Sequence, residues 1–350
     1  MAAAPLELSR GQILGRRRRA SHLDERLSKL NAASLRKAAW AGLQDSMPRA
    51  AVLELHARVG GVSADVLDDG RLVQVWGPRY STYVIAARDR AVFTLGRLPV
   101  DEAGLARAVD MADRLEALLG CDAEEQTYSA AGRALDVNPN ALRYGGPTGR
   151  LLIGWEGSGK PTVRVVSDPD VDPWDARLEL ARRYLYILGP STVEAYARWS
   201  GVKPALANEV FHRLRRSLTP VRTPIGEAVI LSRDAESFAA AGGRPAGEGG
   251  GSPLVRLLPS GDTYFLLQGE DRKLLVPKAA DRNRLWTSRV WPGALLVNGD
   301  VAGTWRRSGS KLTVEPWRRI SAETRAAVEQ EADSLPLPLP TDEPITVTWT

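Results

Sequence analysis

Helix-forming segments followed by a pair of short β-strands recur three times along this 350-residue chain. The first unit has helical patterns at about 32–43 and 48–59, and its strands are expected at Leu72–Trp76 and Thr82–Ala86. A Gly-Pro pair at 77–78 falls between the two strands and indicates a turn. Helices followed by a β-hairpin are the pattern of a winged helix, the helix-turn-helix variant with a strand pair beside its second helix.

The second unit shows the same order of elements. An amphipathic pattern at Asp101–Leu119 precedes two further helical patterns within 129–143, and strands are expected at Leu151–Ile153 and Thr162–Val166. The loop between these strands has the glycine and lysine spacing of a phosphate-binding loop. However, a proline follows Lys160 where that motif needs a hydroxyl, and a strand follows where it needs a helix. We therefore predict that this loop is the wing of the second unit.

The third unit has helical patterns at Trp174–Leu188, Val193–Ser200 and Pro204–Leu218, and a tight turn places Pro204 at a helix start. Strands are then expected around a Gly-rich loop at 239–252, at Ala228–Ser232, Leu254–Leu258 and Thr263–Gln268. Later strands are expected at Leu295–Val297, Val301–Trp305, Leu312–Glu315 and Ile345–Trp349. Asn298-Gly299-Asp300 indicates a hairpin between two of them, and the last alternates like an edge strand.

These patterns predict an α+β protein of three tandem winged-helix units, each a helix-turn-helix with a β-hairpin. The expected units are residues 1–97, 98–170 and 171–350, and the third carries a C-terminal β-rich extension. Because a unit of this size cannot bury a large core alone, we expect the units to pack on one another.

Positive charge is concentrated in the first unit. Residues 1–97 contain 16 Lys and Arg against 9 Asp and Glu, while the whole chain has a net charge of +5. The run Arg16–Arg19 contributes four of these positive charges. This asymmetry favours a polyanionic partner, and a solvated basic helix face is an alternative of about equal weight.

Other classes of protein are not favoured by the composition. Cys121 is the only cysteine, so an internal disulfide is impossible, and the three histidines have no spacing typical of a zinc site. The first residues lack the pattern of a signal peptide, and no apolar run approaches the length of a membrane span. We therefore expect a cytoplasmic protein without a metal or a cofactor.

Gln44 is the polar residue that the local pattern explains least. It lies in the segment Gly42–Arg49, between two helical patterns of the basic first unit. A polar side chain beside a helix start in such a segment is placed to orient a water molecule near bound DNA. A cap or turn hydrogen bond is the alternative interpretation.

Further short segments follow one another in a characteristic order from about residue 8 to residue 325. They are Gly42–Ser46, Leu55–Val59 and Trp76–Arg79 in the first unit, Leu142–Arg143 and Gly149–Trp155 in the second, and Leu188–Thr192, Trp199–Gly201, Leu257–Pro259, Asp271–Arg272, Arg284–Trp286 and Val297–Trp305 in the third. In these segments the chain resembles the AlkZ-like winged-helix DNA glycosylases.

The resemblance implies that three winged-helix units form a concave basic channel around duplex DNA. It also implies a Gln-x-Gln or Gln-x-Asp motif that positions the water displacing an alkylated purine. Gln44 matches the first motif position, but Ser46 stands at the second. Because a hydroxyl can hold a water molecule but adds no charge, monofunctional glycosidic hydrolysis is expected to be weaker than in a Gln-x-Asp enzyme, or absent. Asp45 supplies a carboxylate one residue away.

Basic side chains in loops and at helix ends are expected to contact the phosphates of double-stranded DNA. The candidates are Arg16, Arg17, Arg18, Arg19, Arg79, Lys160, Lys203, Arg213, Arg215 and Arg216. For the last three, an interaction with the helix dipole is an equally weighted alternative. Phosphate contacts set position rather than sequence, so binding by the expected monomer is salt-dependent. The ten tryptophans are expected in the core rather than as platforms for base stacking.

Two other functions remain compatible with the sequence. One is a non-catalytic DNA-binding protein, either a transcriptional regulator or a lesion-recognition factor whose catalytic pair is incomplete at Ser46. The other is a structural or interaction role for the C-terminal β-rich part, unrelated to DNA.

Overall fold

The computed structural model describes residues 6–47, 49–68, 70–122, 124–155, 159–241, 252–337 and 344–350. Most of the Gly-rich loop expected at 239–252, part of the wing loop before Lys160 and the Pro-rich segment at 338–340 lie outside these residues. Within the described ranges the chain mixes helices with three β-sheets, which agrees with the predicted α+β class.

The helices are α1 (Arg10–Ala20), α2 (Ala32–Ala38), α3 (Ala50–His56), α4 (Arg90–Phe93), α5 (Glu102–Leu119), α6 (Tyr128–Ala134), α7 (Pro173–Leu188), α8 (Val193–Ser200), α9 (Pro204–Leu214), α10 (Ala235–Ala239), α11 (Asp271–Leu275), α12 (Ala279–Leu285) and α13 (Ala322–Asp333). The strands are β1 (Leu6–Glu7), β2 (Leu43–Gln44), β3 (Leu72–Trp76), β4 (Thr82–Ala86), β5 (Gln126–Thr127), β6 (Leu151–Gly154), β7 (Thr162–Val165), β8 (Leu218–Thr223), β9 (Gly226–Leu231), β10 (Val255–Leu258), β11 (Gly293–Val297), β12 (Asp300–Ser308), β13 (Lys311–Pro316) and β14 (Thr346–Trp349).

One pattern of strand pairing occurs in three parts of the chain. In the first, the short β2 pairs with β4, and β4 forms a hairpin with β3. In the second, the short β5 pairs with β7, and β7 forms a hairpin with β6. In the third, an isolated bridge joins Ser191 to Val229 of β9, and β9 forms a hairpin with β8. Each short strand thus joins the second strand of the hairpin that follows it.

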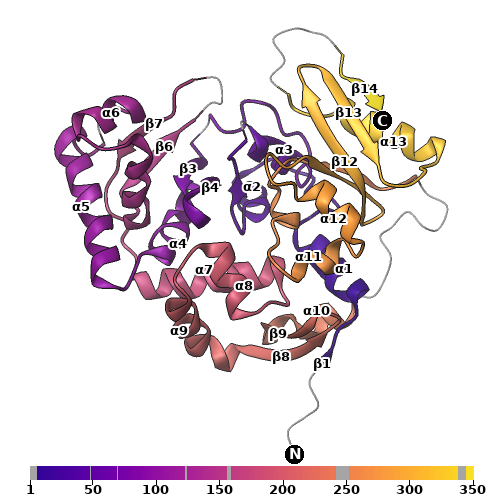
Figure 1. Ribbon diagram of the computed structural model, residues 1–350, viewed down its shortest axis with the longest axis horizontal. Helices are drawn as coiled ribbons and strands as arrows, with labels where there is room; N and C mark the ends of the chain where they lie inside the picture. The colour runs from indigo at the N-terminus through magenta and orange to yellow at the C-terminus, as the bar shows by residue number, and fades with distance from the viewer. Residues whose placement is uncertain are drawn as a thin grey trace, which may run out of the picture.

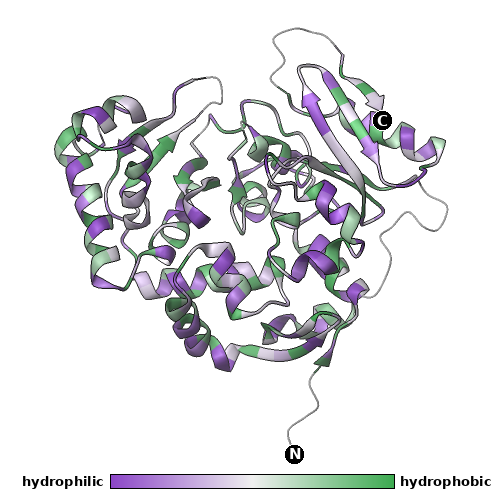
Figure 2. Cartoon of the chain, viewed as in Figure 1, coloured by the Kyte–Doolittle hydropathy of each residue, from purple (hydrophilic) through white to green (hydrophobic). Residues whose placement is uncertain are grey.

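The first two hairpins belong to one six-stranded sheet in the order β2-β4-β3-β6-β7-β5. Gln74 of β3 pairs with Ile153 of β6, and the Gln74 side chain accepts a hydrogen bond from the Trp155 backbone N–H at 2.6 Å. Helix α5 places hydrophobic side chains such as Met111 and Leu115 in the core of this part of the chain. The strands here are mostly hydrophobic, whereas α5 carries both hydrophobic and hydrophilic residues (Figure 2).

The remaining parts lie around the first unit (Figure 1). The α5–α6 part lies on one side of it, α7–α9 with β8 and β9 lie below, and the C-terminal sheet lies on the opposite side (Figure 1). That sheet has the order β10-β11-β12-β13-β14, so the predicted edge strand at the end of the chain is confirmed. The predicted hairpin at Asn298-Gly299 is also confirmed, because both residues have positive φ angles and connect β11 to β12.

Three predicted elements are wrong. The helical pattern expected at about 32–43 ends at Ala38, and Leu43 lies in β2. The expected strand at Thr263–Gln268 is instead a 3-10 helix at Thr263–Phe265, where the Asp262 side chain accepts a hydrogen bond from the Tyr264 N–H. Its run of apolar residues is buried without pairing in a sheet, and burial alone does not distinguish a strand from an irregular core segment. The helix expected to reach Leu218 ends at Leu214, and β8 begins at Leu218.

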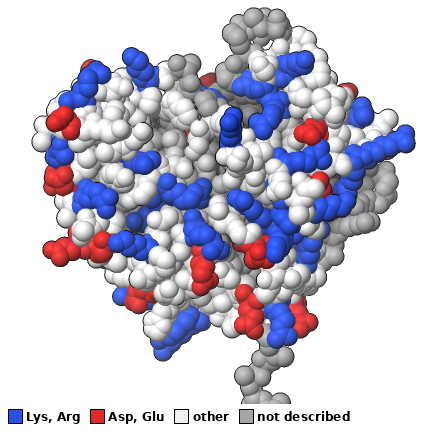
Figure 3. Space-filling view, in the orientation of Figure 1, with Lys and Arg blue, Asp and Glu red and all other residues white. Residues whose placement is uncertain are grey.

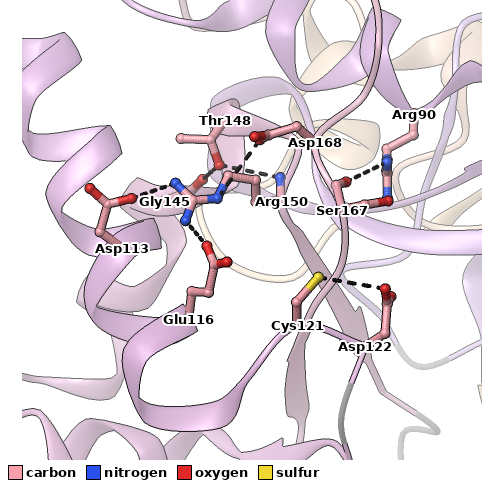
Figure 4. A network of polar contacts seen from close by, with 10 residues as sticks. All are labelled: Arg90, Asp113, Glu116, Cys121, Asp122, Gly145, Thr148, Arg150, Ser167 and Asp168. Atoms are coloured by element: carbon pink, nitrogen blue, oxygen red, sulfur yellow. Dashed lines mark hydrogen bonds and ion pairs between the residues drawn. The ribbon is translucent and has the colours of Figure 1, made fainter.

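The segment between the second and third units is held to its neighbours by polar contacts. Arg150 forms ion pairs with Asp113 and Glu116 of α5, and its Nε atom lies 3.8 Å from Asp168 of this segment (Figure 4). The Arg90 guanidinium donates a hydrogen bond to the Ser167 carbonyl (Figure 4). These contacts hold residues 167–168 close to the expected boundary between the second and third units. No helix within the described ranges is long and apolar enough to cross a membrane.

Candidate active site

Gln44 lies at the end of β2, opposite Tyr83 of β4, and its side-chain amide has a partner on each side. Nη2 of Arg79 donates a hydrogen bond to Gln44 Oε1 at 2.9 Å, and Gln44 Nε2 donates to the Ser46 hydroxyl at 3.1 Å. Gln44 is half-buried and Ser46 is exposed. The Gln44 NH2 group and the Arg79 guanidinium are both donors and repel each other. The contact with Arg79 therefore fixes the amide with its oxygen toward the guanidinium.

Arg79 is itself held in an unusual turn. Its Nη1 atom donates to the Trp199 carbonyl at 3.0 Å, which connects the first unit to helix α8. Arg79 and Tyr80 have φ angles of 55° and 57°, in the left-handed region that non-glycine residues rarely adopt. A Cβ atom at Gly201 would lie 2.9 Å from the Arg79 Cα, so this turn packs tightly against the end of α8. Such backbone strain, about 1–3 kcal/mol per residue, persists only where surrounding contacts enforce it.

A turn of the C-terminal part closes the other side of Gln44. A Cβ atom at Gly261 would lie 3.4 Å from Gln44 Nε2, an ordinary van der Waals contact, and the φ angle of 79° at this position favours glycine. The next residue, Asp262, accepts two hydrogen bonds from Arg58 at 2.7 and 2.8 Å. The Thr263 N–H donates to buried Glu54 at 2.9 Å. Residues more than 200 positions apart in sequence therefore hold the turn that lies beside the Gln44 amide.

Asp45 points away from this amide. Its carboxylate accepts hydrogen bonds from the Ala51 N–H at 3.0 Å and from Gln74 Nε2 at 2.9 Å, and the residue is 0% exposed. Burial raises the pKa of Asp45 to about 6, against the opposing effect of these hydrogen bonds. Gln44 and Ser46 contact each other on one side of this segment, while Asp45 supports the start of α3 from the other. The exposed face therefore carries no carboxylate from Asp45.

A cleft of about 330 Å³ lies beside Ser46. Its described lining includes four aromatic residues, Trp76, Tyr80, Tyr128 and Trp155. The tryptophans were expected in the core, which holds for Trp199 at 1% exposure, but Trp155 is half-buried at this cleft. The signal in the sequence was weak, because these four residues come from a strand end, a turn, a helix start and a loop of two different units.

Comparison with known proteins assigns the chain to a family. The model of the family described as "DNA glycosylase AlkZ-like" matches residues 153–336, which is more than half of the chain. The chain belongs to the AlkZ-like DNA glycosylase family. The matched region begins after Gln44 and Ser46, so the family match does not itself cover the candidate catalytic pair.

Two further comparisons match glycosylases of Streptomyces sahachiroi. A protein named "Interstrand DNA cross-link repair glycosylase" is 30% identical over 171 residues, which is 46% of this chain and 42% of that protein. The solved structure of the "DNA glycosylase AlkZ" superposes with a TM-score of 0.75 at 17% identity, over 99% of this chain and 100% of the other. The structural match shows that the AlkZ fold is shared along nearly the whole chain.

Three arginines of the basic run do not lie on a DNA-binding surface. Arg16, Arg17 and Arg18 on α1 are 5%, 1% and 6% exposed. Arg17 donates to the carbonyls of Gly189 and Pro190 and lies 3.4 Å from the Asp271 carboxylate. The predicted phosphate contacts of Arg16, Arg17 and Arg18 are therefore wrong, because their guanidinium groups are used inside the protein. Arg19, the next residue, is exposed.

The other predicted basic residues are spread over several elements. Lys160 is exposed next to Pro161, which lines the cleft, and Lys203 is exposed but lies 3.2 Å from Asp101. Three more exposed arginines end α9 or follow it, namely Arg213, Arg215 and Arg216. Arg213 forms an ion pair with Glu209 and stacks over Trp174. Arg79 is half-buried and donates to Gln44 and to the Trp199 carbonyl, and its contact with a phosphate stays a prediction.

Lys and Arg side chains extend across the middle of the face shown in Figure 3, while Asp and Glu lie mostly toward its left margin and lower half. A positive surface of this kind attracts polyanions. Among the described residues, no group of three or more His, Cys, Asp or Glu side chains is placed to hold a metal ion.

Proposed function

We propose that this protein is a DNA glycosylase that hydrolyses the N-glycosidic bond of alkylated purines in duplex DNA. The observation that carries the proposal is the Gln44 amide, fixed by Arg79 and hydrogen-bonded to exposed Ser46 in a chain of the AlkZ-like family. We further propose that the three repeats of helices, short strand and hairpin are winged-helix units that surround the DNA. The matching order of strand pairing in the three repeats supports this.

The hydrogen-bonding capacity of the pair suits the positioning of a water nucleophile. The Gln44 carbonyl oxygen has two lone pairs, and Arg79 uses one of them. The Ser46 oxygen also has two lone pairs, and Gln44 Nε2 uses one. One acceptor site remains on each oxygen, enough to receive both hydrogens of a water molecule. The water would then present its own lone pair to the sugar carbon.

This arrangement has no strong base, which restricts the substrate. Asp45 is buried on the other face and Ser46 carries no charge. A purine alkylated at a ring nitrogen is already a cation and leaves without protonation, so water positioning is the main requirement. Neutral bases need a stronger acid or base to leave. We therefore propose that the substrates are cationic alkylpurines.

A direct test follows the release of free base from a duplex that contains one N7-methylguanine. The wild-type protein should release 7-methylguanine, and Gln44→Ala should abolish release while its affinity for the duplex stays nearly unchanged. An Arg88→Met variant, altered at an exposed arginine away from the amide, provides the control. Absence of release by the wild-type protein, with retained binding, would contradict the enzymatic proposal for this lesion.

A second substrate deserves a parallel assay because of the related protein named as a cross-link repair glycosylase. A duplex joined by an N7-guanine interstrand cross-link presents the same cationic leaving group on each strand. We propose that the same site unhooks it, which a denaturing gel detects as separation of the two strands. Retention of the cross-link under conditions that release 7-methylguanine would confine the substrate to simple adducts.

The second candidate function is a lesion-recognition protein without catalysis. The exposed Ser46, in place of the Gln or Asp implied by the family resemblance, is the observation in its favour. Under this proposal the protein binds alkylated duplex more tightly than unmodified duplex but releases no base, and Gln44→Ala changes neither property. The base-release and binding assays together distinguish the two functions.

A further inference from the structure

The turn beside the Gln44 amide is held by buried charged side chains that the water-positioning pair does not use. Residues Pro259–Asp262 form this turn, and the Asp262 N–H donates to the Pro259 carbonyl at 3.1 Å. Gly261 has the positive φ angle that the third position of a type II turn adopts. A Cβ atom at Gly261 would lie 3.4 Å from Gln44 Nε2, so the tip of the turn lies against the amide.

Helix α3 and the segment before Gln44 both hold the end of this turn. The Glu54 carboxyl of α3 accepts a hydrogen bond from the Thr263 N–H at 2.9 Å. The Thr263 hydroxyl donates to the Gly42 carbonyl at 2.8 Å. Arg58, four residues after Glu54, donates to both oxygens of Asp262 at 2.7 and 2.8 Å. The end of the turn is therefore tied to α3 and to the backbone two residues before Gln44.

The buried cluster of Glu54, Arg58 and Asp262 contains two carboxyl groups but one guanidinium, and its side chains are 0%, 2% and 0% exposed. Asp262 takes both arms of the guanidinium, whereas the nearest Glu54 oxygen lies 3.5 Å from Arg58. The second Glu54 oxygen, Oε2, is buried without a hydrogen-bond partner among the described residues. An ionised Glu54 would leave one negative charge uncompensated in the interior. Glu54 is therefore the carboxyl that carries a proton at neutral pH.

The groups that face Glu54 agree with a neutral side chain. They are Arg58, Asp262 of the turn, and the Tyr83 phenol of β4, whose hydroxyl is also buried without a partner within the described part of the chain. Burial raises the pKa of Glu54 to about 8, with a further rise from the Asp262 carboxylate and an opposing effect of Arg58. Above this pH two carboxylates compete for Arg58, and their repulsion loosens the turn that carries Asp262.

We propose that Glu54 is a positioning residue for base release, because in its neutral form it holds the turn Pro259–Asp262 against the Gln44 amide. The inference rests on the proposed glycosylase function. Arg79 fixes the oxygen side of the amide, and the turn limits its Nε2 side. A misplacement of about 1 Å at such a site costs roughly 100-fold in rate. Glu54 is completely buried, so it acts through the turn and not on the DNA.

The experiment measures single-turnover release of 7-methylguanine from about pH 6 to about pH 9 for wild type, Glu54→Gln and Glu54→Ala. Glutamine keeps an acceptor for the Thr263 N–H and resembles the neutral carboxyl, but it does not ionise. Alanine removes the acceptor. Glu331 of α13 is a buried carboxylate that pairs with Arg26 at 2.7 Å, so Glu331→Gln and Glu331→Ala are the matched controls. All rates are measured well below the melting temperature of each protein.

Glu54→Gln should match the wild-type rate near pH 6 and exceed it about tenfold near pH 9, one unit above the pKa of Glu54. Titration of the substrate affects both proteins equally and cancels in this ratio. Glu54→Ala should be slower by roughly 10- to 100-fold at every pH, with nearly unchanged affinity for the duplex.

A ratio of Glu54→Gln to wild-type rates that stays constant with pH overturns the proposal, because a carboxyl that only stabilises the fold gives that result. So does an equal loss of rate in folded Glu331→Ala protein, which would show a general effect of removing a buried carboxylate. If Glu54→Ala does not fold, the ratio for Glu54→Gln decides alone.

Backbone hydrogen exchange of residues 262–265 separates this inference from its foundation, since it reports how firmly the turn is held without any catalysis. Near pH 9 these amides should exchange faster in wild type than in Glu54→Gln, whereas near pH 6 the two proteins should agree. This difference in a wild-type protein that releases no base contradicts the proposed hydrolysis and supports the coupling of Glu54 to the turn. Base release with rate and exchange both indifferent to Glu54 contradicts this inference alone.

Discussion

At the scale of single residues, the candidate site depends on a serine where a carboxylate or amide is implied by the family resemblance. Ser46 is exposed and already hydrogen-bonded to Gln44, so its side chain faces the proposed water. An aspartate at this position adds a base and a counter-charge for the cationic sugar. We expect Ser46→Asp to raise the single-turnover rate of 7-methylguanine release about tenfold.

Ser46→Ala provides the opposite comparison, because it removes one of the two acceptor sites offered to the water. Its rate should fall below that of the wild-type protein, with little change in affinity for the duplex. A rate that is the same with serine, alanine and aspartate would show that this position does not hold the nucleophile.

Arg79 determines the orientation of the Gln44 amide without offering a group to the water. Arg79→Met keeps most of the side chain but removes both guanidinium contacts, to Gln44 and to Trp199. Loss of orientation should lower the single-turnover rate by roughly 10- to 100-fold with a smaller effect on duplex affinity. Arg88→Met serves as the control, and equal losses in affinity and rate would indicate a phosphate contact instead.

At the scale of elements, the last residue of β2 and the residue that follows it have different functions. Gln44 faces the site, and Asp45 faces inward to Ala51 at the start of α3 and to Gln74 of β3. The buried carboxylate thus connects a helix to the sheet. Titration of the Asp45 carboxyl also makes the stability of the folded protein depend on pH.

The pKa of Asp45 is raised to about 6 in the folded protein, whereas an aspartate in the unfolded chain titrates near its ordinary value. Between these two values the folded state holds a proton that the unfolded state has lost, so stability falls as pH rises from about 4 to about 6. The loss from this group is about 3 kcal/mol.

Urea unfolding of wild-type and Asp45→Asn proteins across pH 4 to 7 measures this contribution, because asparagine does not titrate. The unfolding free energy of the wild-type protein minus that of Asp45→Asn should decrease as pH rises from about 4 to about 6. A difference that is constant with pH would show that the carboxyl titrates normally.

At the scale of the whole molecule, helix α1 acts as a buried connector. Arg17 contacts the segment before α8 and Asp271 of α11, whereas its neighbour Arg19 faces solvent. Arg17→Met should cost about 3 kcal/mol or more in unfolding free energy, since it leaves a buried carboxylate without its cation.

Arg19→Met should change stability by no more than about 0.5 kcal/mol. If Arg19 contacts a phosphate, the slope of log Kd against log salt should decrease by about one in this variant. Urea unfolding and DNA binding at several salt concentrations measure both quantities. A change of salt slope in folded Arg17→Met protein would contradict the assignment of Arg17 to the interior.

Most helices and strands were predictable because their signals are local. Helix α8 has the predicted bounds, and the hairpin after β11 has the Asn-Gly pair that its backbone requires. The short strands β2 and β5 were missed, since two-residue strands have no periodicity to detect. Their partners are distant in sequence, and one of them places Gln44 opposite Tyr83.

The sequence by itself determined the order of the elements, the charge and the presence of Gln44 in the first unit, since these depend on neighbouring residues alone. The tertiary structure decided which charges are buried and which way each side chain of β2 points. Four consecutive arginines look alike in sequence, but contacts with residues over 150 positions away make Arg17 internal and leave Arg19 exposed. Burial and hydrogen-bond partners over such separations depend on how the units pack, which no local pattern records.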